Sequence, residues 1–223
     1  MCGRYYLDTL PDLMREHFGA TPPEAYAPHW NIAPTQHAPV LRRHGGEVEF
    51  AMLRWGLVPY WAKDPAIASR LINARGDSVA EKPAYRAAYR KRRCVVPATG
   101  FFEWRAEGNV KQPYAIVPET APCFGFAGLW ETWTDPAGAV LETFAIVTTE
   151  PNSRMLELHD RMPVILEPAD YRRWVVGRTE EAAALIRPSP SDSLRYFPVG
   201  RAVSNARNDR PELVQPIPSQ SLF

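Results

Sequence analysis

The sequence is poor in cysteine, and its cysteines follow no recognisable spacing. There are three in 223 residues, Cys2, Cys94 and Cys123. An odd number of cysteines, without a Cys-x-x-Cys pair or a Cys/His cluster, argues against a disulfide framework and against a zinc site. We therefore expect a chain that needs neither a metal nor a cofactor.

Long apolar runs and an excess of one charge are also missing. No stretch approaches the roughly 18 apolar residues of a membrane-spanning helix, and the amino terminus lacks the basic-then-apolar pattern of a signal peptide. Basic and acidic side chains number 26 and 25, which gives a net charge of +1. We expect a cytoplasmic protein without a membrane partner, in which any basic surface is local.

The pattern of apolar residues predicts an α+β fold. A hydrophobic content of 45% is ample for one core, and the length favours a single domain over residues 1–223. The predicted helices are 9–18 (opened by a capping box at Thr9), 85–93, 171–176 and 180–186. The predicted strands are 48–53, 71–77, 94–98, 100–104, 113–117, 123–130 and 141–149.

Two stretches lack such patterns. The proline-rich residues 19–39 are expected to form an extended loop, and the tail from about residue 208 is expected to be irregular. We expect a monomer with one curved, mostly antiparallel sheet that approaches a β-barrel, and with helices packed on its outside.

The most informative residue is a cysteine directly behind the initiator methionine. We expect Met1 to be removed, because aminopeptidases trim a methionine that precedes a small side chain. Cys2 then carries an α-amine with a pKa of about 8 beside a thiol with a pKa of about 8.5. Such a 1,2-aminothiol attacks one aldehyde carbon twice, first through nitrogen and then through sulfur, and closes a thiazolidine ring. The alternative is a cysteine that stands here by chance.

A carboxylate lies among aromatic residues in Gly100-Phe101-Phe102-Glu103-Trp104. In a strand, Phe102 and Trp104 share one face, and Phe101 and Glu103 share the other. Glu103 is then either an exposed residue or a partly desolvated acid with a raised pKa, as in general acid–base catalysis.

A second proton-transfer candidate is His159, which precedes Asp160 and Arg161 at a turn between a short helix and a strand. We expect Asn152 to cap that helix. Histidine titrates near neutral pH and is the usual proton shuttle. A structural histidine is the alternative.

Amide and guanidinium groups end the apolar run 71–77. Asn73 can both donate and accept hydrogen bonds, and Arg75 can clamp a phosphate with two parallel bonds. The basic segment 85–93 can track a phosphate backbone, although a run of charges is usually a solvated face.

Aromatic residues crowd the segment 53–62. Exposed rings on a loop can stack on unpaired bases at about 1–3 kcal/mol per base, whereas most tryptophan clusters cap a core. We expect Trp55 in the core and Trp61 nearer a ligand. Asn31, in the segment 30–34, is either a binding residue or a buried asparagine that bonds loop backbone.

Six blocks of the sequence together resemble a known family. They are Met1-Cys2-Gly3-Arg4-Tyr5, Asn31-Ile32-Ala33-Pro34, Arg54-Trp55-Gly56-Leu57-Val58-Pro59, Asn73-Ala74-Arg75, Gly100-Phe101-Phe102-Glu103-Trp104 and His159-Asp160-Arg161-Met162-Pro163. Their order resembles that in the SRAP family, the SOS-response-associated peptidases, which are understood as abasic-site processing proteins. The resemblance extends from residue 2 to about residue 215.

The resemblance implies a partner and a set of roles. The partner is single-stranded DNA with an abasic site, which implies association with the nucleoid. Cys2 captures the ring-opened sugar as a thiazolidine cross-link that protects the lesion, and Asn73 holds the Cys2 amine or the sugar oxygen. Glu103 shuttles protons, and His159 assists ring opening and cross-link reversal.

The implied DNA contacts are Arg4, Asn31, Trp55, Trp61, Arg75, Thr148 and Arg161. Some family members carry two adjacent tryptophans where this chain has Tyr60 and Trp61, so the ring that wedges between bases stays open. Two other functions also stay open: a thiol peptidase that exposes Cys2 by self-processing, and a non-covalent binder of single-stranded DNA.

Overall fold

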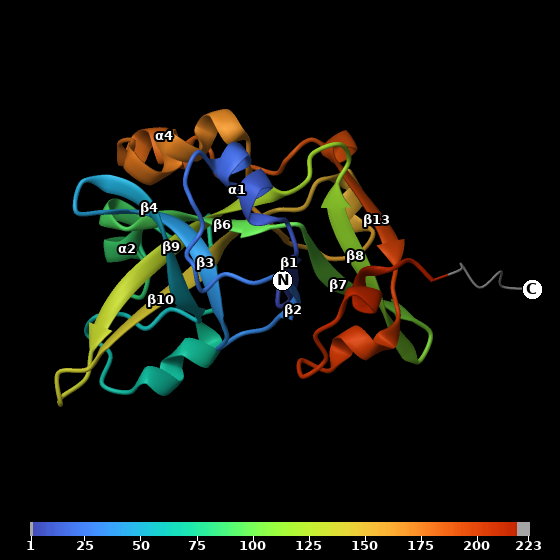
Figure 1. The fold of residues 1–223 in the computed structure, drawn as a ribbon, viewed down its shortest axis with the longest axis horizontal. Helices are drawn as coiled ribbons and strands as arrows, with labels where there is room; N and C mark the ends of the chain where they lie inside the picture. Colours follow the sequence, from blue (N-terminus) through green and yellow to red (C-terminus); the bar gives the residue numbers. More distant parts are fainter. Residues whose placement is uncertain (1, 218–223) are drawn as a thin grey trace, which may run out of the picture.

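The computed structural model describes residues 2–217 and contains two sheets (Figure 1). The smaller sheet is antiparallel throughout. Its strand order is β13 (Leu194–Pro198), β8 (Val110–Pro118), β7 (Gly100–Glu107), β1 (Tyr5–Leu7) and β2 (His29–Ile32).

Five strands of the larger sheet close into a barrel, because the last of them pairs with the first. In order they are β10 (Val140–Thr149), β4 (Glu47–Trp55), β3 (His37–His44), β6 (Arg93–Ala98) and β9 (Phe124–Thr134), which returns to β10. Only the β4–β10 pairing within this ring is parallel. The prediction of a curved, mostly antiparallel sheet in an α+β fold is confirmed.

Three short strands extend the barrel. β5 (Asn73–Arg75) and β11 (Met162–Pro163) pair with β10, and β12 (Ile165–Leu166) pairs with β9. β5 pairs with residues 146–148 of β10 and β11 pairs with residues 148–149, so both meet the carboxyl end of β10.

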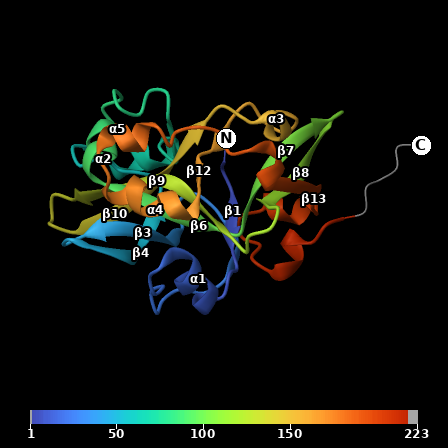
Figure 2. The same cartoon turned by 90° about the horizontal axis from the view of Figure 1, so that it is seen from above.

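The helices are short and lie around the strands (Figure 2). The α-helices are α1 (Pro11–Phe18), α2 (Arg86–Lys91), α3 (Ser153–Leu156), α4 (Tyr171–Val176) and α5 (Thr179–Ala183). The 3₁₀-helices are η1 (Pro65–Arg70), η2 (Pro168–Asp170), η3 (Ser191–Ser193), η4 (Arg201–Ser204) and η5 (Pro211–Val214). Within residues 2–217 no helix combines the length and the hydropathy needed to cross a membrane.

Three local predictions are wrong. The capping box at Thr9 does not form, because α1 has Leu10 at its N-cap position and the Thr9 hydroxyl bonds that of Thr99 at 2.9 Å. The predicted loop 19–39 contains β2, whose partner is β1, and the first three residues of β3, which pair with β4. The tail is not wholly irregular, since η5 inserts Leu213 into a core.

β7 separates two cores, as its alternation predicts. Phe101 packs in the main core of the barrel, while Phe102 packs with Tyr6, Val203 and Leu213 in a second core. Glu103 follows the side of Phe101 and is therefore directed toward the barrel. In Figure 1, β1 lies near the middle of the molecule, between the barrel strands and β7, β8 and β13.

Candidate active site and nucleic-acid interface

Cys2 lies just ahead of β1 and is completely buried. Its carbonyl oxygen accepts a hydrogen bond of 2.8 Å from the Asn73 side-chain amide. Burial raises the pKa of the Cys2 thiol well above its ordinary value, and the charge of Glu103 raises it further. The thiol is therefore neutral at physiological pH and needs a base to lose its proton.

Glu103 is the titratable group beside that thiol. It is 4% exposed, so the buried-acid interpretation of the sequence holds rather than the exposed one. Burial raises the pKa of Glu103 to about 7. Both protonation states are then populated at neutral pH, and the carboxyl can either donate or accept a proton.

Asn73 is fixed from three sides. It begins β5, where it pairs with Ile146 of β10. Its carbonyl oxygen accepts a bond of 2.9 Å from the Tyr85 hydroxyl, and the preceding carbonyl, that of Ile72, accepts one of 2.9 Å from the Trp55 indole. The Asn73 amide is thereby held against Cys2.

His159 lies on the loop after α3, which Asn152 caps through a 2.8 Å bond to the Met155 N–H, as predicted. The Nδ1 atom of His159 lies 3.1 Å from the backbone nitrogen of Arg161 and 2.7 Å from a carboxylate oxygen of Asp160. The contact with Arg161 requires an unprotonated Nδ1 that accepts a hydrogen bond, whereas the contact with Asp160 requires a protonated Nδ1 that donates one. Because burial lowers the pKa of His159, the neutral ring that accepts from Arg161 is the form at pH 7.

The same loop approaches Glu103. The charge of Asp160 contributes to raising the pKa of Glu103, after the larger effect of burial. Asn73 and Glu103 thus act directly on Cys2, and the loop that carries His159 lies within electrostatic range of Glu103.

Two arginines lie at the end of β10 that β5 and β11 share. Arg75 pairs with Asp77 at 2.8 Å, and Arg161 approaches the same carboxylate at 3.4 Å. The Arg161 guanidinium also donates to the Thr148 carbonyl at 2.8 Å and to its hydroxyl at 3.3 Å. Asp77 therefore bridges the two guanidinium groups, and the charge of Asp160 also acts on Arg75.

Asp77 was not among the predicted site residues. It lies in the turn that follows β5, so strand alternation gave no signal for it, and the only sign in the sequence was a carboxylate two residues after Arg75.

Trp55 lies in the core, as predicted, and Trp61 lies at the surface. Trp55 is completely buried and stacks on Phe144, with ring centres 6.2 Å apart. Trp61 is 47% exposed and lines a hollow of about 550 Å³ together with Lys63 and Arg70. The segment 56–72, here called the arch, connects β4 to β5 and carries Trp61. A small separate core that includes Ala62, Ala68 and Trp133 supports it.

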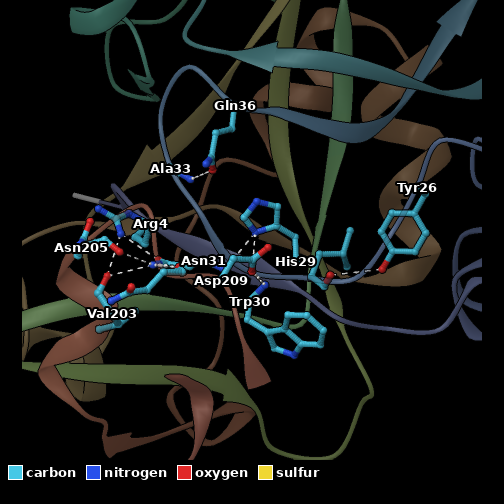
Figure 3. A network of polar contacts seen from close by, with 12 residues as sticks. Arg4, Tyr26, His29, Trp30, Asn31, Ala33, Gln36, Val203, Asn205 and Asp209 are labelled. Atoms are coloured by element: carbon cyan, nitrogen blue, oxygen red, sulfur yellow. Dashed lines mark hydrogen bonds and ion pairs between the residues drawn. The ribbon is translucent and has the colours of Figure 1, made fainter. Parts of the chain in front are cut away.

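Arg4 and Asn31 meet in a polar network (Figure 3). The Asn31 amide donates to the carbonyls of Val203, Asn205 and Asn208 at 3.2, 3.1 and 2.8 Å, and its oxygen accepts from Arg4 at 2.9 Å. Asn31 thus has the backbone-bonding role that the sequence left open.

Burial corrects part of the implied DNA surface. Asn31, Trp55 and Thr148 are each 0% exposed, so their side chains offer no surface to a strand. The basic helix is also less available than its sequence suggests. Arg93 is buried and bonds the Trp174 carbonyl, and Arg92 pairs with Glu131 at 2.6 Å.

No three His, Cys, Asp or Glu side chains in the described range 2–217 are arranged to hold a metal ion.

Known proteins resemble the chain over almost its full length. It is 36% identical over 222 residues to the abasic site processing protein YoqW of Bacillus subtilis (strain 168), covering 96% of this chain and 99% of that protein. It is 30% identical over 263 residues to the abasic site processing protein HMCES of Xenopus tropicalis, covering 97% of this chain and 78% of that protein.

The fold matches as well. A crystal structure of a Bacteroides thetaiotaomicron protein superposes with a TM-score of 0.88 at 27% identity, covering 97% of this chain and all of the other. Residues 1–206 match the family described as SOS response associated peptidase. With this match and relatives at 30–36% identity, the chain belongs to the SRAP family.

Proposed function

We propose that this protein processes abasic sites in single-stranded DNA, and that it captures the lesion as a thiazolidine through the α-amine and thiol of Cys2. The observation that carries the proposal is the setting of Cys2: completely buried, bonded to Asn73 at 2.8 Å and beside a Glu103 carboxyl whose pKa is raised to about 7. The names of the relatives from Bacillus and Xenopus support the substrate.

The chemistry begins with removal of Met1, which places the α-amine on Cys2. That amine adds to the aldehyde carbon of the opened sugar, and the adduct loses its hydroxyl as water to give a Schiff base. The sulfur then adds to the same carbon while the thiol proton passes to nitrogen. One aldehyde and one aminothiol give one thiazolidine and one water.

Each neighbour has a step in this sequence. Protonated Glu103 donates to the departing hydroxyl, and ionised Glu103 then accepts the proton of a thiol that burial keeps neutral. Neutral His159 accepts a proton when the sugar ring opens. The bond from Asn73 holds Cys2 so that both attacks reach one carbon.

The DNA is held beside these groups. Arg75 and Arg161 take phosphates at the shared edge of β10. Trp61 stacks on a base next to the lesion, and the hollow that it lines with Lys63 and Arg70 receives the adjoining strand.

The test is the intact mass of the denatured protein before and after incubation with a single-stranded oligonucleotide that carries one abasic site. We expect the mass to lack Met1 and then to increase by the oligonucleotide minus one water. Cys2→Ala abolishes the adduct. Loss of Met1 without any adduct would contradict capture.

The same samples separate the other functions. A thiol peptidase retains slow hydrolysis of peptides as Cys2→Ser, whereas the oxygen analogue of a thiazolidine is much less stable, so capture is lost. A non-covalent binder gives no species that survives denaturation with any variant.

A further inference from the structure

The C-terminal segment 203–208, here called the strap, crosses the outside of β1 and β2. Three of its carbonyls accept hydrogen bonds from the single amide group of Asn31. Val203 inserts into the second core beside Tyr6 and Phe102. The strap is therefore fixed to β2 by hydrogen bonds and to β1, the strand that follows Cys2, through the second core.

Asp209 anchors the end of the strap. Its carboxylate accepts from the Trp30 N–H at 2.7 Å and lies 3.1 Å from His29 Nδ1. Both partners lie on β2, next to Asn31 (Figure 3).

Arg4 connects this assembly to the nucleophile. One terminal nitrogen of its guanidinium donates both to the Asn31 oxygen and to the Val203 carbonyl, each at 2.9 Å. The guanidinium also lies 6.0 Å from the ring centre of Trp104, whose indole N–H bonds the strap residue Ser204 at 3.0 Å. The donors of this nitrogen are thus directed at Asn31 and the strap.

The main chain of Arg4 is equally constrained. Its carbonyl accepts from the Phe102 N–H at 2.9 Å, and the Cys2 sulfur lies 3.9 Å from the same oxygen. Arg4 is only two residues from Cys2, so its position sets where the nucleophile lies.

We propose that Arg4 and Asn31 are positioning residues that lock the strap against the start of the chain and thereby place Cys2, and that Arg4 is not a phosphate contact. A site that is held in place by a supporting layer reacts faster, and small displacements can cost on the order of 100-fold in rate. The part that concerns DNA capture depends on the function proposed above.

The first experiment measures capture and salt dependence with Arg4→Lys and Asn31→Ala, with Arg75→Ala and the exposed strap arginine variant Arg207→Ala as comparisons. A lysine keeps the charge but loses the planar donor group. We expect Arg4→Lys and Asn31→Ala each to slow capture at saturating DNA on the order of 10- to 100-fold. Arg207→Ala captures normally.

The second experiment measures the affinity of the same variants for an intact single strand at several salt concentrations. It distinguishes a positioning role of Arg4 from a phosphate contact. Each phosphate contact contributes about 0.7 to the slope of log affinity against log salt. We expect Arg75→Ala to lower the slope by about 0.7 and both Arg4→Ala and Asn31→Ala to leave it unchanged. A slope lowered by Arg4→Ala, with normal capture by Arg4→Lys, would overturn the proposal.

A third readout is independent of DNA. The rate of alkylation of Cys2 by iodoacetamide, followed by peptide mass mapping in folded samples with matched thermal unfolding, reports how firmly the nucleophile is buried. We expect it to rise at least about tenfold in Arg4→Lys and Asn31→Ala. An unchanged alkylation rate in these variants would overturn the positioning role of Arg4 and Asn31. If the rate rises in the variants but the native protein never captures DNA, only the proposed function is refuted.

Discussion

At the scale of single residues, burial sets the chemistry of the site. The Cys2 thiol is kept neutral and the Glu103 carboxyl is brought to a pKa of about 7 by the same loss of water. An acid that exchanges protons at neutral pH therefore lies beside a nucleophile that cannot ionise by itself.

This arrangement predicts a pH dependence of capture. The rate should rise as the pH increases from about 5 to 7, because Glu103 ionises and can then accept the thiol proton. Glu103→Gln should slow capture on the order of 100-fold and make this rise less steep, leaving the part that is due to the Cys2 α-amine, with little change in affinity for an intact strand. Single-turnover capture on denaturing gels measures the profile. A variant that binds poorly but captures normally once bound would contradict the role.

The same burial has a cost in stability. Because the folded-state pKa of Glu103 is raised to about 7, the stabilising contribution of its protonated form is full below about pH 4 and is lost as the pH rises to about 7. We expect Glu103→Gln to be more stable than the native protein at pH 8, on the order of 3 kcal/mol, and equally stable near pH 4. Urea unfolding at the two pH values measures this difference. An equal gain at both would show that charge is not its cause.

At the scale of secondary-structure elements, connections decide where the side chains of the site lie. Gly56 has φ = +115° at the end of β4, where the chain leaves the barrel for the arch that carries Trp61. A Cβ atom at Gly56 would lie 2.8 Å from the Ala68 carbonyl oxygen. Both the backbone conformation and the space require glycine.

Gly56→Ala should therefore lower the free energy of unfolding by about 2–4 kcal/mol. Gly108→Ala is the matched control, because Gly108 also has a positive φ of 60° but has open space around it. We expect that control to lose only about 1 kcal/mol. Equal losses in thermal or urea unfolding would show that crowding by Ala68 is not important.

The sequence predicted the hairpin partners β7 and β8 and the partners β9 and β10, but it missed β3, although β3 pairs with the adjacent β4. The β7–β8 hairpin has its turn at Gly108, and α4 has the predicted bounds, Tyr171–Val176. The sequence did not predict β2, because that strand is defined by its pairing with β1 and the prolines around it favour a loop. The choice between two roles for Asn31 could not be made either, because its partners lie more than 170 positions away.

At the scale of the molecule, the closed barrel and the near-zero net charge limit how DNA can be bound. With 26 basic and 25 acidic side chains, the proposed attraction to a strand comes from local groups, Arg75 with Arg161 and Lys63 with Arg70. General electrostatic attraction over the whole surface is weak.

We therefore expect a shallow salt dependence for an intact single strand. Two to four phosphate contacts give a slope of about −1.4 to −2.8 in log affinity against log salt. Fluorescence anisotropy of a labelled oligonucleotide across a salt series measures it. A slope steeper than about −5 would require a much larger basic surface than this one.

The strap also has a consequence for the order of events during synthesis. Cys2 is synthesised long before residues 203–208, which fix Arg4 beside it. In the folded protein Cys2 is completely buried, so its backbone nitrogen is not exposed to an aminopeptidase. On the proposed mechanism, methionine excision therefore belongs to the nascent chain, and protein produced faster than the aminopeptidase can act would accumulate in a folded but permanently inactive form.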